Sequence, residues 1–272
     1  MTDEPRPAGV HKEGSPMTND DSNKEATPSE AAARDAANWA NLTRSLELGE
    51  VPPEAHNINV SGRRQTSPLQ GFGKMWQKSY LVVLSGVGVT PQEVIATWKE
   101  EFQSFWPEGN HYYGPLTAIA PGDVALLNLS MPGKLTMSTG VLVLYADEES
   151  FTFMTPEGHM FAAFITFSAF EDKDGNTAAK VHVLLRANDP IFEVALAMFG
   201  HRKENRFWTH TMSALAKRFG VRNPTVDIQL VCVDRRRQWR NAGNLRYNSA
   251  LRSAAYMVAS PVRALRKKSP RR

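Results

Sequence analysis

The pattern of apolar and polar positions becomes regular at about residue 78 and then changes period several times. Residues 78–85 (KSYLVVLS) have the composition of a strand, and Thr90 followed by Pro91 is typical of a helix start, so a helix is predicted over 91–105. Short polar turns separate the runs that follow, which predicts antiparallel neighbours. These strand-like runs are 123–130, 139–146, 150–155, 160–170 and 178–187.

A long helix is predicted after this meander. Asp189 followed by Pro190 suits its N-terminus, and apolar residues at helical spacing continue to Phe219, with Gly200-His201 as the point where the helix kinks or splits. The predicted fold class is therefore α+β, with a curved antiparallel sheet wrapped around a long C-terminal helix.

The two flanks of this pattern have different compositions. Residues 1–45 are predicted to be a disordered acidic leader containing a short helix from about Ser29 to Leu48. Turn-forming residues across 46–77 indicate a surface strap. The folded domain is assigned to 78–222, and residues 223–272 are assigned to a strand, which either extends the sheet or pairs with the strap, and a basic helical tail.

This order of elements resembles the helix-grip fold of the SRPBCC superfamily, the START-like and polyketide-cyclase-like proteins. The stretch STGVLVLYADEESFTFMTPEGHMFAAFITFSAF, followed by VLLRANDPIFE and HRKENRFW, looks like a bacterial branch of SRPBCC-type proteins without an established activity. The resemblance implies a cavity between sheet and helix that holds a lipid, a polyketide or another hydrophobic small molecule. It does not imply a reaction, because one scaffold serves both binding modules and enzymes.

Composition limits the compartment and the chemistry. The chain has 272 residues, is 42% hydrophobic and contains one cysteine, Cys232, so it forms no internal disulfide and a reducing, cytoplasmic location is expected. No apolar run approaches the roughly 18 residues of a membrane span. The seven histidines show no metal-binding spacing, and GVG at 86–88 lacks the rest of a dinucleotide fingerprint, so no metal and no cofactor are expected.

The strand predicted over 160–170 is apolar on one face along its whole length and on the other face only at its start. The second face is expected to be covered by the strap or by the C-terminal segment. Within the cavity, apolar side chains are expected to supply affinity and Tyr113, His159 or Arg186 to orient a polar group of the ligand. The complete set of predicted ligand-binding residues is Tyr113, Phe153, His159, Phe167, Val183, Arg186, Phe192 and Phe199.

Glu157 and His159 flank Gly158 in a turn before this strand, and a carboxylate beside an imidazole is a candidate acid/base pair at a cavity mouth. The alternative is a solvated hairpin turn. Similarly, Arg186 either binds an anionic ligand group or pairs with Glu193 to join a strand end to a helix start. The main hypothesis is ligand binding without reaction. The alternatives are a cyclase, hydratase or hydrolase-like enzyme, and an interaction module with a filled core.

The C-terminal region is strongly basic: twelve Arg and Lys residues and no acidic residue follow Asp234. A helix with Leu251 and Val258 on one stripe, interrupted at Pro261, is the pattern of a protein peripheral to an anionic membrane. Packing of this stripe on the domain is the alternative, and the lack of a recognition fold argues against nucleic acid. The predicted membrane-surface residues are Arg235, Arg236, Arg237, Trp239 and Arg240. The oligomeric state and the identity of the ligand are left open.

Overall fold

The computed structural model describes residues 36–41, 43–49, 52, 54–114, 119–131 and 135–267, with side chains described as far as residue 259. Residues 37–272 form one compact unit. The disorder predicted for the leader falls on residues 1–35, outside the described residues. The strands are β1 (Gln65–Thr66), β2 (Met75–Val83), β3 (His111–Tyr113), β4 (Val124–Met131), β5 (Leu135–Ala146), β6 (Ser150–Pro156), β7 (Phe161–Glu171), β8 (Thr177–Ala187) and β9 (Val226–Asp234).

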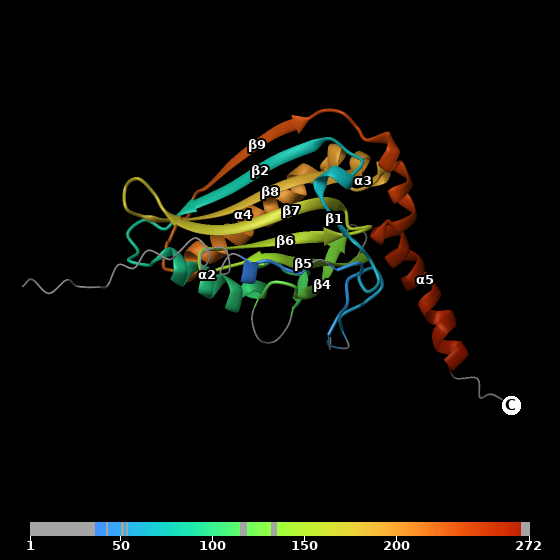
Figure 1. Ribbon diagram of the computed structural model, residues 1–272. Coiled ribbons are helices and arrows are strands. Elements are labelled where there is room, and N and C mark those ends of the chain that lie inside the picture. Colours follow the sequence, from blue (N-terminus) through green and yellow to red (C-terminus); the bar gives the residue numbers. More distant parts are fainter. Residues whose placement is uncertain are drawn as a thin grey trace, which may run out of the picture. The chain divides into compact units, whose positions relative to one another are not determined.

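Eight of these strands follow one another across a single antiparallel sheet in the order β3-β4-β5-β6-β7-β8-β2-β9, and β1 pairs with the end of β6. Figure 1 shows β9 and β2 at one edge, with β8, β7, β6 and β5 following in order. The predicted meander is confirmed, since β4 to β8 are neighbours in chain order. The strand after the long helix, β9, extends the sheet beside β2.

Two helical segments pack on the inner face of the sheet. They are α2 (Pro91–Glu100) with the 3₁₀ turn η2 (Phe102–Phe105), and α3 (Pro190–Ala195) continuing through a π-helical turn, η4 (Leu196–Gly200), into α4 (His201–Arg218). Both predicted starts are confirmed. Thr90 forms a capping box with Glu93, and the carboxylate of Asp189 accepts the backbone N–H groups of Ile191 and Phe192 at 2.9 and 3.0 Å.

The kink expected near Gly200-His201 is the π-helical turn itself. A π-turn inserts one extra residue without ending the helix, and such turns are common at functional sites. The helix therefore continues to Arg218 as the central element against the sheet. The fold is the helix-grip fold.

The outer face of the sheet is covered by segments from both ends of the unit. Gln70 ends η1 (Pro68–Gln70), which packs over the start of β7, and Gly71 directly after η1 would meet Ala162 if it carried a Cβ atom. This confirms that the second face of β7 is covered by the strap. Farther along the sheet, a small apolar cluster joins the strap to β4 and β5; it consists of Leu46, Ala55, Val60, Leu126 and Leu142.

Two predicted helices differ from the structure. The helix expected from Ser29 to Leu48 does not extend past Ala37: the Ala40 N–H donates to the Leu144 carbonyl at 2.8 Å, so this segment runs along β5 instead. The second is the helix of the basic tail, which was predicted to be interrupted at Pro261. In the structure, η5 (Trp239–Tyr247) precedes α5 (Ser249–Lys267), and α5 continues through Pro261.

The packing face of α5 also differs from the prediction. Ser249 and Ser253 are buried against β5, whereas Leu251 and Val258 are 50% and 80% exposed. The Asn59 side chain donates to the Ser138 carbonyl at 2.8 Å and to Ser253 Oγ at 3.2 Å. Ala250, Ala254 and Met257 lie beside residues of β5, so the face of α5 that meets the sheet combines hydrogen-bonding serines with apolar side chains.

Candidate functional site

An apolar cavity of about 170 Å³ lies between the inner face of the sheet and the continuous helix α3–η4–α4. For comparison, a dry cavity of about 150 Å³ lined by aliphatic and aromatic side chains is large enough to bind benzene. The strands alternate side chains between their faces, so every second residue of several strands contributes to the wall. The principal apolar wall residues are Leu127, Leu129, Val141, Phe153, Ile165, Phe167, Val183, Phe192, Leu196, Phe199, Phe207 and Trp208.

Six of the eight residues predicted to bind a ligand are in this wall. The strand residues Phe153, Phe167 and Val183 point inward because they occupy the apolar face of β6, β7 and β8. The other three predicted residues in the wall are His159, before β7, and Phe192 and Phe199, on the helix. Their ligand-binding role stays a prediction.

The cavity reaches the surface beside the π-turn. Phe199 is in the wall and yet 47% exposed, and Lys203, one turn later, is also exposed. The Lys203 ammonium donates to the backbone carbonyl of Ser130 at the end of β4, so a cation bridges helix and sheet at this mouth. Met160 in the turn between β6 and β7 completes this rim.

His159 is a buried, neutral imidazole in the wall. Its Nδ1 lies 3.0 Å from both the backbone N and the carbonyl O of Phe161, so it accepts from the N–H in one tautomer and donates to the carbonyl in the other. Burial lowers the pKa of His159 to about 4, although the hydrogen bond with the Phe161 backbone raises it. At neutral pH, His159 therefore carries no charge.

Glu157 does not form the predicted acid/base pair with His159 at the cavity. Its carboxylate accepts hydrogen bonds from Nε and Nη2 of Arg64 in the strap, at 3.0 and 2.6 Å, and it is not part of the cavity wall. The turn is not a freely solvated hairpin either, because Gly158 and His159 are buried. The Gly158 carbonyl accepts the Ser249 N–H at 2.9 Å, so the start of α5 lies against this turn.

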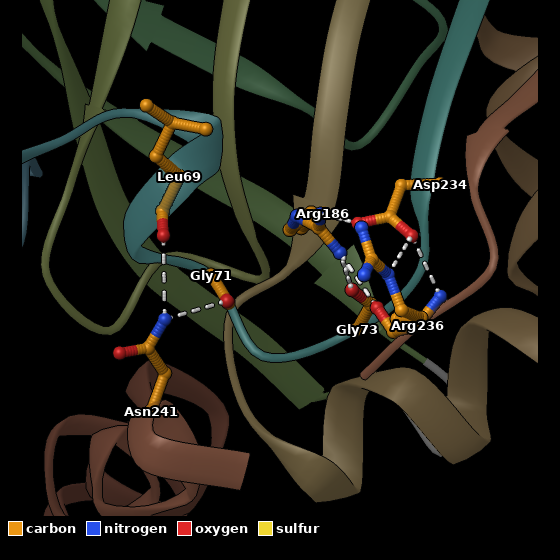
Figure 2. Close-up of polar contacts among 7 residues, drawn as sticks. All are labelled: Leu69, Gly71, Gly73, Arg186, Asp234, Arg236 and Asn241. Atoms are coloured by element: carbon orange, nitrogen blue, oxygen red, sulfur yellow. Dashed lines mark hydrogen bonds and ion pairs between the residues drawn. The ribbon is translucent and has the colours of Figure 1, made fainter. Parts of the chain in front are cut away.

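Arg186 lies outside the cavity, and its predicted ligand-binding position is wrong. Because Leu185 faces the core, Arg186 points to the other face of β8. There its guanidinium donates to the Gly73 carbonyl at 2.6 Å, the Arg236 carbonyl at 2.9 Å and the Asp234 carboxylate at 2.6 Å (Figure 2). The predicted pairing with Glu193 is not formed either. Arg186 instead joins the strap and the end of β9 to the sheet.

Tyr113 is also outside the wall. It packs with the outer apolar cluster, whereas its neighbour Tyr112 contacts Phe102 and Phe153 on the inner face, with its hydroxyl buried. Burial raises the pKa of the Tyr112 phenol. Tyr113 was predicted as a ligand-binding residue, but β3 was not predicted as a strand, and without it the alternation of faces could not be assigned.

The basic segment after β9 lies beside the start of α3. Arg237 Nε is 3.0 Å from Glu193 Oε1, and Arg236 Nε is 3.3 Å from Asp234 Oδ1. Trp239 is 74% exposed and meets Phe72 edge to face. The five residues predicted to face a membrane are therefore close to the helix that borders the cavity, although nothing in this arrangement tests membrane binding.

A buried ion pair at the cavity was missed in the sequence. Lys78 Nζ lies 2.5 Å from Glu204 Oε2, with the two side chains 0% and 8% exposed. Glu204 is in the cavity wall. Burial raises the pKa of Glu204, whereas Lys78 lowers it. The available signal was that Lys78 and Tyr80 occupy the same face of β2, which is the inner one.

The chain matches no protein-family model and no curated protein. Solved structures that are similar include protein Ms6760 from Mycobacterium smegmatis, 11% identical over 63% of this chain and 96% of that one, with a TM-score of 0.38. The di-domain ARO/CYC StfQ from the steffimycin biosynthetic pathway is 7% identical over 54% and 53%, with a TM-score of 0.40. Ara h 8.0201 is 15% identical over 53% and 97%, with a TM-score of 0.39.

Each of these matches is at most 15% identical and has a TM-score below 0.5. A likeness at this level carries no argument about activity. Within the described ranges, no cluster of three or more His, Cys, Asp or Glu side chains could hold a metal ion. None of the described helices has both the length and the apolar character of a bilayer span.

Proposed function

We propose that this protein binds a hydrophobic or amphipathic small molecule, lipid-like or polyketide-like, in its internal cavity without changing it chemically. The observation that carries the proposal is an apolar cavity, walled by aromatic and aliphatic side chains, that opens beside Phe199. Burial of apolar ligand surface supplies affinity of about 25 cal/mol per Å². An apolar wall gives up no hydrogen bonds when an apolar ligand enters, and it gains dispersion contacts with the ligand.

The size of the cavity favours a ligand that is only partly enclosed. At about 170 Å³ it is smaller than the roughly 300 Å³ at which pockets begin to enclose drug-sized molecules. One apolar ring or a short stretch of acyl chain would occupy it, and the rest of the molecule would lie at the mouth. Lys203 and the unpaired Nε1–H of Trp106 are donors in the wall that are available to a polar group of the ligand.

The two alternative functions are less well supported. An enzyme using Glu157 and His159 as acid and base would need both groups at the cavity, and Glu157 is bound to Arg64 elsewhere. An interaction module would be expected to fill its core with its own side chains, whereas this core leaves open space. Ligand binding requires neither a further catalytic group nor a rearrangement of the core.

We further propose that ligand exchange takes place at an anionic membrane surface. Val194 and Met198 on the exposed side of the helix are 58% and 74% exposed beside the cavity mouth. Arg235, Arg240 and Trp239 belong to the segment that Arg237 joins to α3. Exposed apolar side chains flanked by cations are typical of surfaces that rest on anionic lipid, where each cation contributes about 1 kcal/mol.

The test is native mass spectrometry of the purified protein, followed by solvent extraction and identification of any bound molecule. We expect a co-purifying hydrophobic compound. Val183→Phe, which extends a buried wall residue into the cavity, should reduce its occupancy, and Leu69→Phe on an exposed strap position should not. A clean apo mass, together with no binding of added hydrophobic probes, would refute the proposal.

A further inference from the structure

Glu204 gives the apolar cavity one buried, charged hydrogen-bond acceptor. Its side chain belongs to the wall, and Glu204 is the only acidic residue among the described residues that line the cavity. Lys78 lies behind it, outside the wall, with Nζ 2.5 Å from Oε2. A molecule in the cavity therefore meets the acceptor oxygens of the pair and not the ammonium donor.

Three other polar side chains of the wall have hydrogen-bond partners, whereas the buried Nε1–H of Trp106 in the same wall has none. Asn110 donates to the Pro107 carbonyl and accepts from the Ser130 N–H, each at 3.1 Å. Lys203 donates to the Ser130 carbonyl, and His159 Nδ1 is hydrogen-bonded to the Phe161 backbone. Glu204 accepts a hydrogen bond from Lys78, and a carboxylate has about four lone-pair sites, so it retains capacity for another donor.

Stability alone does not explain this pair. Replacing a buried ion pair by well-packed apolar residues is often neutral or stabilising, so a core built only for stability has no need of one. Here the pair borders open space, where its remaining hydrogen-bonding capacity is available to a ligand. Its net charge is zero, which favours a neutral partner, and a ligand carboxylate in the same place would be repelled by Glu204.

We propose that Glu204 accepts a hydrogen bond from a hydroxyl group on the enclosed, apolar part of the ligand, with Lys78 as the residue that positions the carboxylate. The proposal rests on the ligand-binding function and narrows it to a chemical class: neutral alcohols or phenols on an apolar skeleton. Ligands with a buried carboxylate are excluded from this position.

The first test compares 2-naphthol with 2-methylnaphthalene by isothermal titration calorimetry on the full-length protein. The two probes have nearly the same shape and differ by a hydroxyl against a methyl group. Since hydrogen bonds to charged groups are among the stronger ones, we expect 2-naphthol to bind roughly tenfold more tightly. Equal binding of both probes would refute the hydroxyl proposal and leave ligand binding intact, whereas binding of neither would refute both.

The second test removes the pair as a unit. In Lys78→Met/Glu204→Leu the roughly tenfold preference should disappear while 2-methylnaphthalene still binds. The matched control is Arg218→Met/Glu101→Leu, which removes an exposed ion pair involving the same helix and should keep the preference. If the first double variant does not fold, Lys78→Gln/Glu204→Gln should reduce the preference several-fold. An undiminished preference in a folded variant of the buried pair would refute the role of Glu204.

Discussion

Nε of Arg237 lies 3.0 Å from Oε1 of Glu193, which joins the basic segment after β9 to the first turn of α3. Glu193 is nearly buried, while the Arg237 side chain is 43% exposed. This contact brings the cations of the C-terminal region next to the exposed apolar side chains at the cavity mouth. The basic segment and the start of the long helix, which are more than 40 residues apart in the sequence, thereby form one surface.

Membrane binding should depend on this surface. We expect Val194→Ser/Met198→Ser to weaken binding to vesicles containing anionic phospholipid by about tenfold or more, since each apolar side chain contributes about 1 kcal/mol on partial burial. Vesicle flotation would measure it. The matched control is Val231→Ser/Val233→Ser, which removes two similarly exposed side chains from the edge strand β9. Equal losses in both variants, or binding that is insensitive to salt, would contradict the assignment.

Breaking the buried pair from one side should destabilise the fold. Lys78→Met leaves the Glu204 carboxylate buried without its cation, and Glu204→Leu leaves the Lys78 ammonium unpaired, so each should lower the free energy of unfolding by about 3–5 kcal/mol. The double variant should lose much less than the sum. Urea unfolding of the four proteins gives the coupling energy. Additive losses would show that the pair does not act as a unit.

Gly158 should be sensitive to a single added methyl group. Its φ is +85°, and a Cβ atom there would lie 2.0 Å from the Tyr247 carbonyl oxygen. Gly158→Ala should lower the free energy of unfolding by about 3 kcal/mol, from backbone strain and displacement of η5. The control is Gly220→Ala, with φ +93° and no atom within 4 Å, which should lose only the strain, about 1 kcal/mol. Equal losses in urea unfolding would refute the contact with Tyr247.

Acidification should destabilise the protein partly through His159. Its folded-state pKa is lowered to about 4, below the unfolded value of about 6.5, so the unfolded chain binds the proton first. The contribution of neutral His159 to the free energy of unfolding is on the order of 3 kcal/mol. It is complete above pH 6.5 and is lost as the pH falls toward 4. His159→Gln should flatten this part of the stability profile. His201, whose pKa burial also lowers to about 4, leaves a residual slope.

The control for this profile is His210→Gln, on an exposed position of α4. We expect its stability between pH 6.5 and 4 to follow that of the unchanged protein. If His159→Gln and His210→Gln gave the same profile, the burial of His159 would not be the cause of the pH dependence. Thermal unfolding monitored by circular dichroism at several pH values is sufficient for this comparison.

Much of the site could be predicted because it depends on local alternation. The inward positions of Phe153, Phe167 and Val183 follow from period-two patterns on strands with clear turns. Errors arose where orientation depended on an element that was not predicted: without β3, the position of Tyr113 on the outer face could not be assigned. Arg186 was misplaced for a different reason, because its partners Gly73 and Asp234 lie far away in the sequence.

The sequence by itself determined the order of the elements, the meander and the starts of α2 and α3, because these depend on turn chemistry, caps and hydrophobic period within a few residues. Tertiary structure alone decided that the core retains open space, that Lys78 and Glu204 meet across 126 positions and that the basic segment lies at the cavity mouth. A phenylalanine that lines a cavity and one that fills a core have the same local pattern. The difference lies in how closely the helix and the sheet approach each other.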